Sequence, residues 1–213
     1  RRTMNEGDFT KVLAIPDVSG SMSGQPMNVA VTLSILTAKV AAIQKSKFGN
    51  MIVTFSAEPN FVFLDESDCL KDNVKKVMQS ESHGLNTDLY KTFSIMIDKS
   101  IQNNVAPSEF PEKIIIFTDM QFDQATQCKH QQDMMSNLQS LFDITPYTLP
   151  DIVCWNLRPV NNVAATSSTQ GVALVSGFSK DTFKNIINKG EFTPYDVMRN
   201  AIDNKRYSIL SVS

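Results

Sequence analysis

The sequence predicts an α/β fold with a doubly wound, mostly parallel six-stranded sheet, one antiparallel edge strand and helices on both faces. Short apolar runs rich in β-branched residues recur along the chain, and longer segments of helical periodicity separate most of them. Continuous apolar runs of this length are typical of strands buried on both faces, as in a parallel sheet. The alternation of strands and helices favours a layered arrangement with helices packed on the sheet.

Six runs are predicted as strands, and one pair of them differs from the rest. The connection AEPN between two of the runs is too short for a crossover, so this pair is expected to be antiparallel at one edge of the sheet. The predicted strands are 11–17 (KVLAIPD), 51–56 (MIVTFS), 61–64 (FVFL), 113–119 (KIIIFTD), 151–157 (DIVCWNL) and 171–177 (GVALVSG).

The segments between these runs have the periodicity of helices. A long segment begins at Pro26, a residue favoured in the first helical turn, and it is apolar nearly all round, which predicts a deeply packed helix. Apolar residues at helical spacing predict further helices over 70–78, 89–97 and 134–142. Thr193, Pro194 and Asp196 form a helix-start pattern near the end of the chain.

Length and composition predict one domain. The chain has 213 residues, of which 42% are hydrophobic and 20% charged, so it is long enough to bury a sizeable core. We expect a single domain over 1–213, in which 1–10 lead in from a longer parent chain and 203–213 form a C-terminal extension. The net charge of −2 gives no electrostatic footprint for nucleic acid or an anionic membrane, and neither is expected as a partner.

The cysteines indicate a reducing compartment. Cys69, Cys128 and Cys154 are odd in number and widely spaced, which is typical of reduced, intracellular cysteine rather than of a disulfide or zinc framework. No run approaches about 18 consecutive apolar residues, and the first residues lack the apolar segment of a signal peptide. We therefore expect an intracellular, cytoplasmic protein.

Three polar loops are predicted to meet at one edge of the sheet. Asp17 closes the first strand and Asp119 closes the strand 113–119, while the loop HGLNTDLY brings Thr87 and Asp88 to the start of a helix. In a doubly wound sheet, ligands bind outside the carboxyl ends of the strands. The segment DVSGSMSGQP, residues 17–26, is therefore expected to contribute to a binding site.

Three chemistries for this segment are disfavoured. A nucleotide-binding loop needs G-x-x-x-x-G-K-[ST] or G-x-G-x-x-G, and neither occurs. A hydrolase elbow needs a serine midway between two glycines, but Met22 stands between Gly20 and Gly24, and the chain holds only His83 and His130 as candidate histidine bases. An aspartyl-phosphate enzyme would place an acid two residues after Asp17, where this chain has serine.

A hard-cation site fits these residues better. Mg²⁺, or Mn²⁺ in its place, suits a few carboxylate and hydroxyl oxygens with positions left open for water or ligand. The candidate ligands are Asp17, Ser19, Ser21, Thr87 and Asp119. The alternative is a polar turn in which the serines cap the helix after Pro26, with Thr87 or Asp88 capping their own helix. We expect Asp123 to be a helix N-cap rather than a ligand.

These residues resemble a known family. The pattern D-x-S-x-S from Asp17, with Thr87 and the strand-end Asp119, is similar to the metal-ion-dependent adhesion site of von Willebrand factor A (vWA) domains, and the similarity extends over 10–188. FTDM replaces the family's usual T-D-G. More narrowly, DVSGSMSGQPM, FTDMQFDQA, WNLR and GVALVSGFSK resemble intracellular A-domain proteins of plants, fungi and giant viruses, in which a larger N-terminal region precedes the A domain. For a giant-virus source, a place in the viral particle is a further expectation.

The resemblance implies a non-catalytic, divalent-cation-dependent protein-protein interaction module. Ser19, Ser21 and Thr87 would contact the ion, Asp17 and Asp119 would bind it directly or through water, and an acidic side chain of a partner protein would complete the coordination. The rim expected to contact the partner comprises Met22, Asp88, Asn156, Arg158 and Ser176. Two of these residues have alternative roles that need no partner: Asn156 would close a turn, and Arg158 would be solvated. A metal-dependent hydrolase or phosphatase at the same site, and a structural vWA module of a ribonucleoprotein, are the alternative functions.

Overall fold

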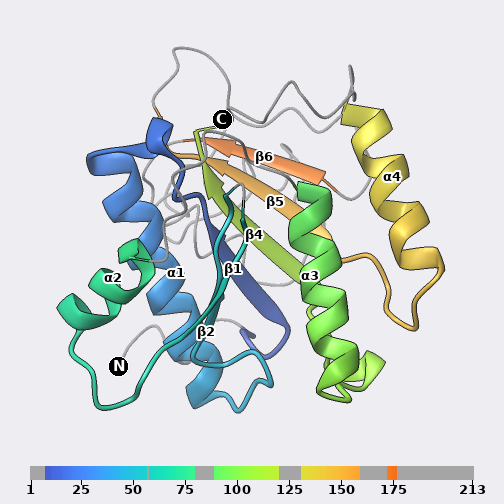
Figure 1. The fold of residues 1–213 in the computed structure, drawn as a ribbon, viewed down its shortest axis with the longest axis horizontal. Helices are drawn as coiled ribbons and strands as arrows, with labels where there is room; N and C mark the ends of the chain where they lie inside the picture. The colour runs from blue at the N-terminus through green and yellow to red at the C-terminus, as the bar shows by residue number, and fades with distance from the viewer. Residues whose placement is uncertain (1–7, 57, 80–88, 120–130, 159–171, 177–213) are drawn as a thin grey trace, which may run out of the picture.

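The computed structural model describes residues 8–56, 58–79, 89–119, 131–158 and 172–176. In chain order the strands and α-helices are β1 (Val12–Pro16), α1 (Gln25–Ile43), β2 (Met51–Val53), β3 (Phe61–Phe63), α2 (Leu70–Gln79), α3 (Leu89–Gln102), β4 (Lys113–Thr118), α4 (Gln131–Asp143), β5 (Asp151–Asn156) and β6 (Val172–Ser176), with short 3-10 helices η2 (Gly20–Met22) and η3 (Pro107–Glu109) (Figure 1). The predicted helix start at Thr193, the proposed cap Asp123, both histidines and Cys128 lie outside the described residues.

Four strands form a parallel sheet in the order β1-β4-β5-β6. The register pairs Pro16 with Phe117, Thr118 with Asn156, and Asn156 with Ser176, so the carboxyl ends of the four strands lie at one edge. The mostly parallel α/β architecture expected from the sequence is confirmed. This edge is where the polar loops begin.

The remaining two strands form a separate antiparallel ladder. β2 pairs with β3 in antiparallel register, as the short connection between them predicts. Beyond β2, Phe55 reaches β1 by an isolated parallel bridge to Asp17, in which Phe55 N donates to Pro16 O at 2.9 Å and Val18 N to Phe55 O at 3.2 Å. The expected single six-stranded sheet is therefore replaced, in the described residues, by four-stranded and two-stranded sheets joined at this bridge.

Alternating side chains of the parallel strands supply two cores. In β4, Ile115 and Phe117 pack with residues of α1, whereas Ile114 and Ile116 pack with residues of α3 and α4. Figure 1 shows α1 and α2 on one side of the strands, with α3 and α4 on the other. The central strands are apolar on both faces because both faces are covered by helices.

Helix α1 is the central helix of one core. Its buried residues, among them Ala30, Val31 and Ile35, cover most of its circumference, and one stripe that includes Thr32 and Leu36 is exposed. By length and composition alone it could cross a membrane, with a mean hydropathy of 1.5 over 18 residues, but half of that window is buried within the protein. Pro26 lies in its first turn, and Gly24 before it has φ of 95°, a conformation that favours glycine.

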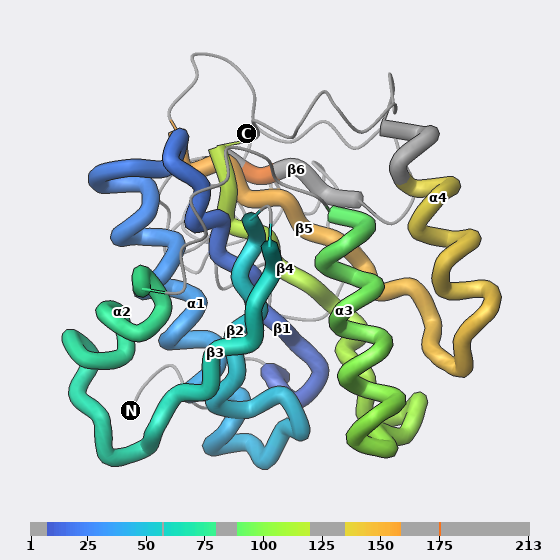
Figure 2. The backbone as a smooth tube through the Cα atoms, in the orientation of Figure 1, coloured from blue at the N-terminus to red at the C-terminus, as the bar shows by residue number. Residues whose placement is uncertain are grey.

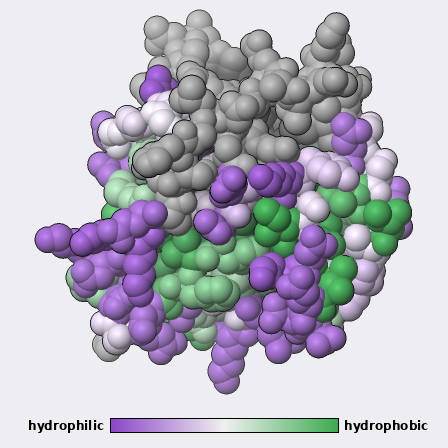
Figure 3. All heavy atoms as spheres, viewed as in Figure 1, coloured by the Kyte–Doolittle hydropathy of each residue, from purple (hydrophilic) through white to green (hydrophobic). Residues whose placement is uncertain are grey.

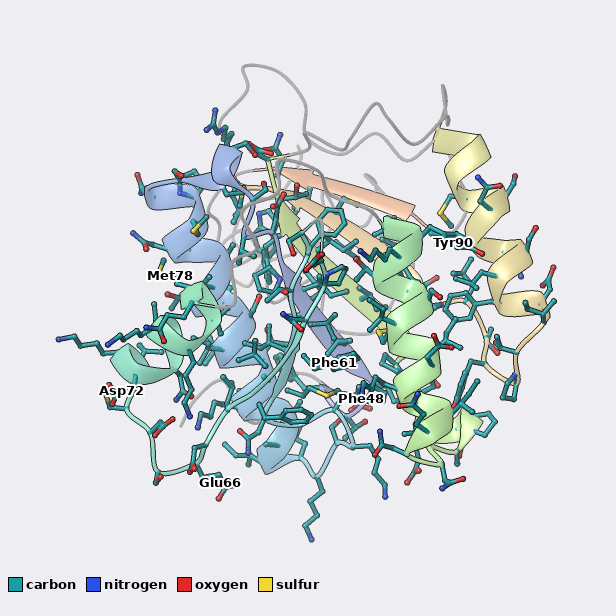
Figure 4. The ribbon with its side chains drawn as sticks, in the orientation of Figure 1. Phe48, Phe61, Glu66, Asp72, Met78 and Tyr90 are labelled. Atoms are coloured by element: carbon teal, nitrogen blue, oxygen red, sulfur yellow. The ribbon has the colours of Figure 1, made fainter. Side chains whose placement is uncertain are left out.

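An exposed apolar surface with a groove adjoins the β2-β3 pair. Figure 2 shows the tube of β3 running beside β2, and Figure 3 shows apolar residues gathered over this part of the face with hydrophilic residues on either side. Phe63 is 70% exposed. A groove of about 660 Å³ lies between these strands and α3, and its walls include Phe48 and Phe61, which Figure 4 shows close together. This groove is lined by residues other than those of the polar edge.

Candidate metal centre

The loop after β1 is fixed by backbone hydrogen bonds and by burial. Asp17 N donates to Phe117 O at 2.8 Å, which continues the β1-β4 ladder. Val18 and Met22 are fully buried in the core beneath the loop. The prediction that Met22 contributes to a partner-binding rim is therefore wrong, because η2 turns this side chain inward. The loop's polar side chains are left at the edge of the sheet.

The carboxylate of Asp17 is buried and hydrogen-bonded through both oxygens. Oδ1 accepts a hydrogen bond from Ser19 N at 2.9 Å, and Oδ2 accepts one from Thr118 Oγ1 at 2.8 Å. Burial raises the pKa of Asp17 above its ordinary value, and the nearby charge of Asp119 raises it further, while the hydrogen bonds from Ser19 and Thr118 act in the opposite direction. A buried carboxylate of this kind is stabilised by a nearby cation.

The serines after Asp17 have separate roles. Ser19 Oγ and Ser21 Oγ lie 3.0 Å apart, and Ser19 is almost fully buried. Ser23 Oγ instead donates to Gly20 O at 2.8 Å, and the N-cap of α1 is Gly24 with no side-chain hydrogen bond. In the described structure, therefore, none of these serines caps α1 with its side chain. Ser23 thus stabilises the loop itself.

Asp119 brings a second carboxylate to the same edge. It follows β4 directly and is only 6% exposed, and its charge acts on Asp17. Arg158 Nε lies 3.5 Å from Asp119 Oδ2, and Arg158 Nη2 donates to the carbonyl oxygen of Ser21. One guanidinium therefore links the loop after β1 to the residue that follows β4.

The turn after β5 positions this arginine. Leu157 is buried and its N donates to Thr118 O at 2.9 Å, which extends the β4-β5 ladder by one bond. Asn156 Oδ1 accepts a hydrogen bond from Arg158 N at 2.8 Å, so Asn156 closes the turn as its alternative role predicts. The side chain of Arg158 is partly exposed to solvent, but it also contacts oxygens of Asp119 and Ser21, so solvation alone does not describe it. Ser176, in register with Asn156, ends β6 at the same edge.

The oxygens of this edge fit a small hard cation. Ligands at adjacent corners of an octahedron with bonds of about 2.1 Å lie about 3.0 Å apart, and the two serine hydroxyls have this separation, which is equally that of a hydrogen bond. Each oxygen of Asp17 already accepts one hydrogen bond, which suits contact with an ion through water. Among the described residues no three His, Cys, Asp or Glu side chains form a metal-binding group, so such a site depends on hydroxyls.

The structure brings four of the five predicted ligands to one edge. These are Asp17, Ser19, Ser21 and Asp119; Thr87 and its rim neighbour Asp88 lie outside the described residues. The sequence interpretation missed Thr118, whose hydroxyl binds Asp17. The parallel register of β1 and β4 could have indicated it: Pro16 pairs with Phe117, so the next residue, Thr118, lies beside Asp17.

One comparison with a solved structure agrees with an α/β fold. The crystal structure of Deinococcus radiodurans RO (RSR) protein superposes with a TM-score of 0.55 and 18% identity, over 92% of this chain and 34% of that one. The SpRpn10 VWA domain superposes with a TM-score of 0.46 and 10% identity, over 95% of this chain and 98% of that one. The first likeness concerns the fold alone.

A comparison of sequences finds a relative with higher identity than these solved structures have. Uncharacterized protein L728 of Acanthamoeba polyphaga mimivirus is 32% identical over 201 residues, which are 93% of this chain. The chain spans about a third (34%) of that relative's length. The model of the domain of unknown function DUF7788 matches residues 11–208. The chain therefore belongs to the DUF7788 family.

Proposed function

We propose that the domain is a non-catalytic binding module of the vWA type, in which Mg²⁺ or Mn²⁺ is held at a metal-ion-dependent adhesion site and is completed by a partner's carboxylate. The observation that carries the proposal is the pair of buried carboxylates, Asp17 and Asp119, directly after the neighbouring strands β1 and β4 and beside the hydroxyls of Ser19 and Ser21. Buried charges are costly unless a cation or hydrogen bonds stabilise them. A divalent ion supplies that stabilisation.

The charge of the proposed ligand set favours an acidic partner. Two carboxylates cancel the formal charge of Mg²⁺, and serine hydroxyls add none. Mg²⁺ keeps open positions filled by water, and a further anionic oxygen replaces water readily. Ser21, which is partly exposed, marks the side from which a partner would approach. An aspartate or glutamate of a protein partner fits this position.

Binding is favoured over hydrolysis by the side chains of the edge. Its described polar side chains are carboxylates, hydroxyls, one amide and one guanidinium. Both carboxylates are proposed to hold the metal, so a general base for hydrolysis would have to come from outside the described residues. A screen of phosphatase and nuclease substrates with Mg²⁺ and Mn²⁺ tests this alternative, and turnover lost in Ser21→Ala would establish it. No described residue favours the ribonucleoprotein alternative.

Two measurements test the proposal in sequence. Isothermal titration of the protein with Mn²⁺ is expected to show one site that Asp119→Asn abolishes and Ser23→Ala, a change in the same loop, leaves intact. Fluorescence anisotropy then compares a labelled peptide library containing central glutamate with the matched glutamine library, in Mg²⁺ and in EDTA. Binding of the glutamate library in Mg²⁺ alone is the expected result. Absence of a Mn²⁺ site in the wild-type protein would overturn the proposal.

A further inference from the structure

Arg158 is a cation already present at the candidate metal centre. Its Nε lies 3.5 Å from Asp119 Oδ2, and its Nη2 donates to Ser21 O. The carboxylate side chain is fully buried in this pair, whereas the arginine side chain is 45% exposed. The buried acid therefore has a positive partner that reaches it from the solvent side.

The contact joins the two residues between which a divalent ion would lie. Ser21 and Asp119 are both proposed ligands, and the guanidinium contacts both residues. Two positive charges so close together repel each other, and the repulsion is strong where the charges are partly removed from water.

We propose that Arg158 is an internal cation that competes with the divalent ion: it holds Asp119 while metal is absent, and it gives up this contact when metal enters. The inference rests on the proposed metal-binding function. The exposure of the arginine side chain makes the change possible, because the guanidinium can turn into water with little loss of packing. Its backbone keeps its place through the hydrogen bond from Arg158 N to Asn156 Oδ1.

The exchange reverses the local charge of the described residues. With Arg158, the carboxylates of Asp17 and Asp119 leave a formal charge of −1, and a bound divalent ion changes the sum to +1. The guanidinium, once released, presents N–H groups that suit a carboxylate in a bidentate pair. Metal entry thus converts an edge that repels acidic groups into one that attracts them.

A different role for Arg158 makes the opposite prediction. Groups that hydrogen-bond to metal ligands commonly orient them and strengthen metal binding. If Arg158 positioned Asp119 in this way, its removal would weaken the metal site. Competition requires instead that its removal tightens the site.

The test compares Mn²⁺ affinity in the wild-type protein, Arg158→Gln, Arg158→Lys and Lys11→Gln. Lys11 is the matched control, because its exposed side chain pairs with Glu112 at the opposite end of β1. Removal of the arginine is expected to tighten Mn²⁺ binding about fivefold, which corresponds to about 1 kcal/mol. Arg158→Lys keeps the charge and is expected to change the affinity less, and Lys11→Gln to leave it unchanged.

A spectroscopic readout follows the guanidinium itself. The Nε–Hε resonance of Arg158, assigned by its loss in Arg158→Lys, is expected to shift when diamagnetic Mg²⁺ is added. Unchanged or weaker Mn²⁺ binding by Arg158→Gln, with wild-type binding intact, would overturn the competition while leaving the metal site standing. A wild-type protein without Mn²⁺ affinity would instead remove the proposed function, and the inference with it. Thermal melts of each variant establish that it folds.

Discussion

Replacement of Asp17 by asparagine is expected to have opposite effects in the absence and presence of metal. Without metal, the raised pKa means that the surroundings of this fully buried side chain favour its neutral form. Asparagine is neutral and nearly the same shape; its Oδ1 accepts the bond from Ser19 N, and the Thr118 hydroxyl rotates to accept from the amide. Because the raised pKa reflects a cost of ionising this buried group, which asparagine does not pay, we expect Asp17→Asn to increase the unfolding free energy in EDTA.

With metal, the order of stability reverses. A ligand at a hundred times its dissociation constant stabilises the folded state by about 2.7 kcal/mol, or about 5–10 °C in Tm for a domain of this size. Asp17→Asn removes one charge from the proposed ligand set and is expected to lose that shift. Ser23→Ala is the matched control, because its hydroxyl bonds only within the loop, to Gly20 O, and it should keep the full shift.

The assay is thermal unfolding followed by circular dichroism in EDTA and in saturating Mn²⁺. The difference without metal should also depend on pH. A carboxyl with a raised folded-state pKa favours folding below its ordinary value of 3.8, and this contribution is lost as pH rises through the folded-state pKa. The advantage of Asp17→Asn should therefore shrink as pH falls toward 3.8. An equal Mn²⁺ shift in variant and wild type, or a loss of more than about 1 kcal/mol in EDTA, would refute the reasoning.

Three further predictions concern the surroundings of the site and the core. Thr118→Val removes the donor to Asp17 Oδ2 and is expected to lower the unfolding free energy, measured in urea, by about 1–3 kcal/mol. Thr118→Ser keeps the hydroxyl and should retain most of the stability, so equal losses in the two variants would contradict a hydrogen-bond role. Burial raises the pKa of Cys154 to about 12, so iodoacetamide at pH 8 should label exposed Cys69 and leave Cys154 unmodified until urea unfolds the protein, as peptide mass spectrometry would show. Gly49→Ala places a Cβ 2.5 Å from Ala42 Cα and should lower stability by about 1–3 kcal/mol; an unchanged Tm would show that the backbone moves apart freely.

Local pattern was enough to predict most of the described elements. The apolar runs form strands that helices cover on both faces. Such strands are continuously apolar and rich in β-branched residues, and this pattern can be recognised in the sequence. The connection AEPN predicted an antiparallel pair because its length excludes a crossover. The ends of strands also placed Asp17 and Asp119 at one edge, since parallel strands share an end.

Residue pairs far apart in sequence needed the tertiary structure. Thr118 and Asp17 meet through sheet register, and Arg158 reaches Ser21 and Asp119 because the β5 ladder runs one residue further than its strand. Met22 shows the same limit in reverse, since a methionine between serines carries no sign of which way a 3-10 turn will face. The sequence by itself determined which oxygens stand at the ends of strands. Only the packing of β1, β4 and β5 decided which of them touch, because register and turn direction depend on contacts between segments that lie far apart in the sequence.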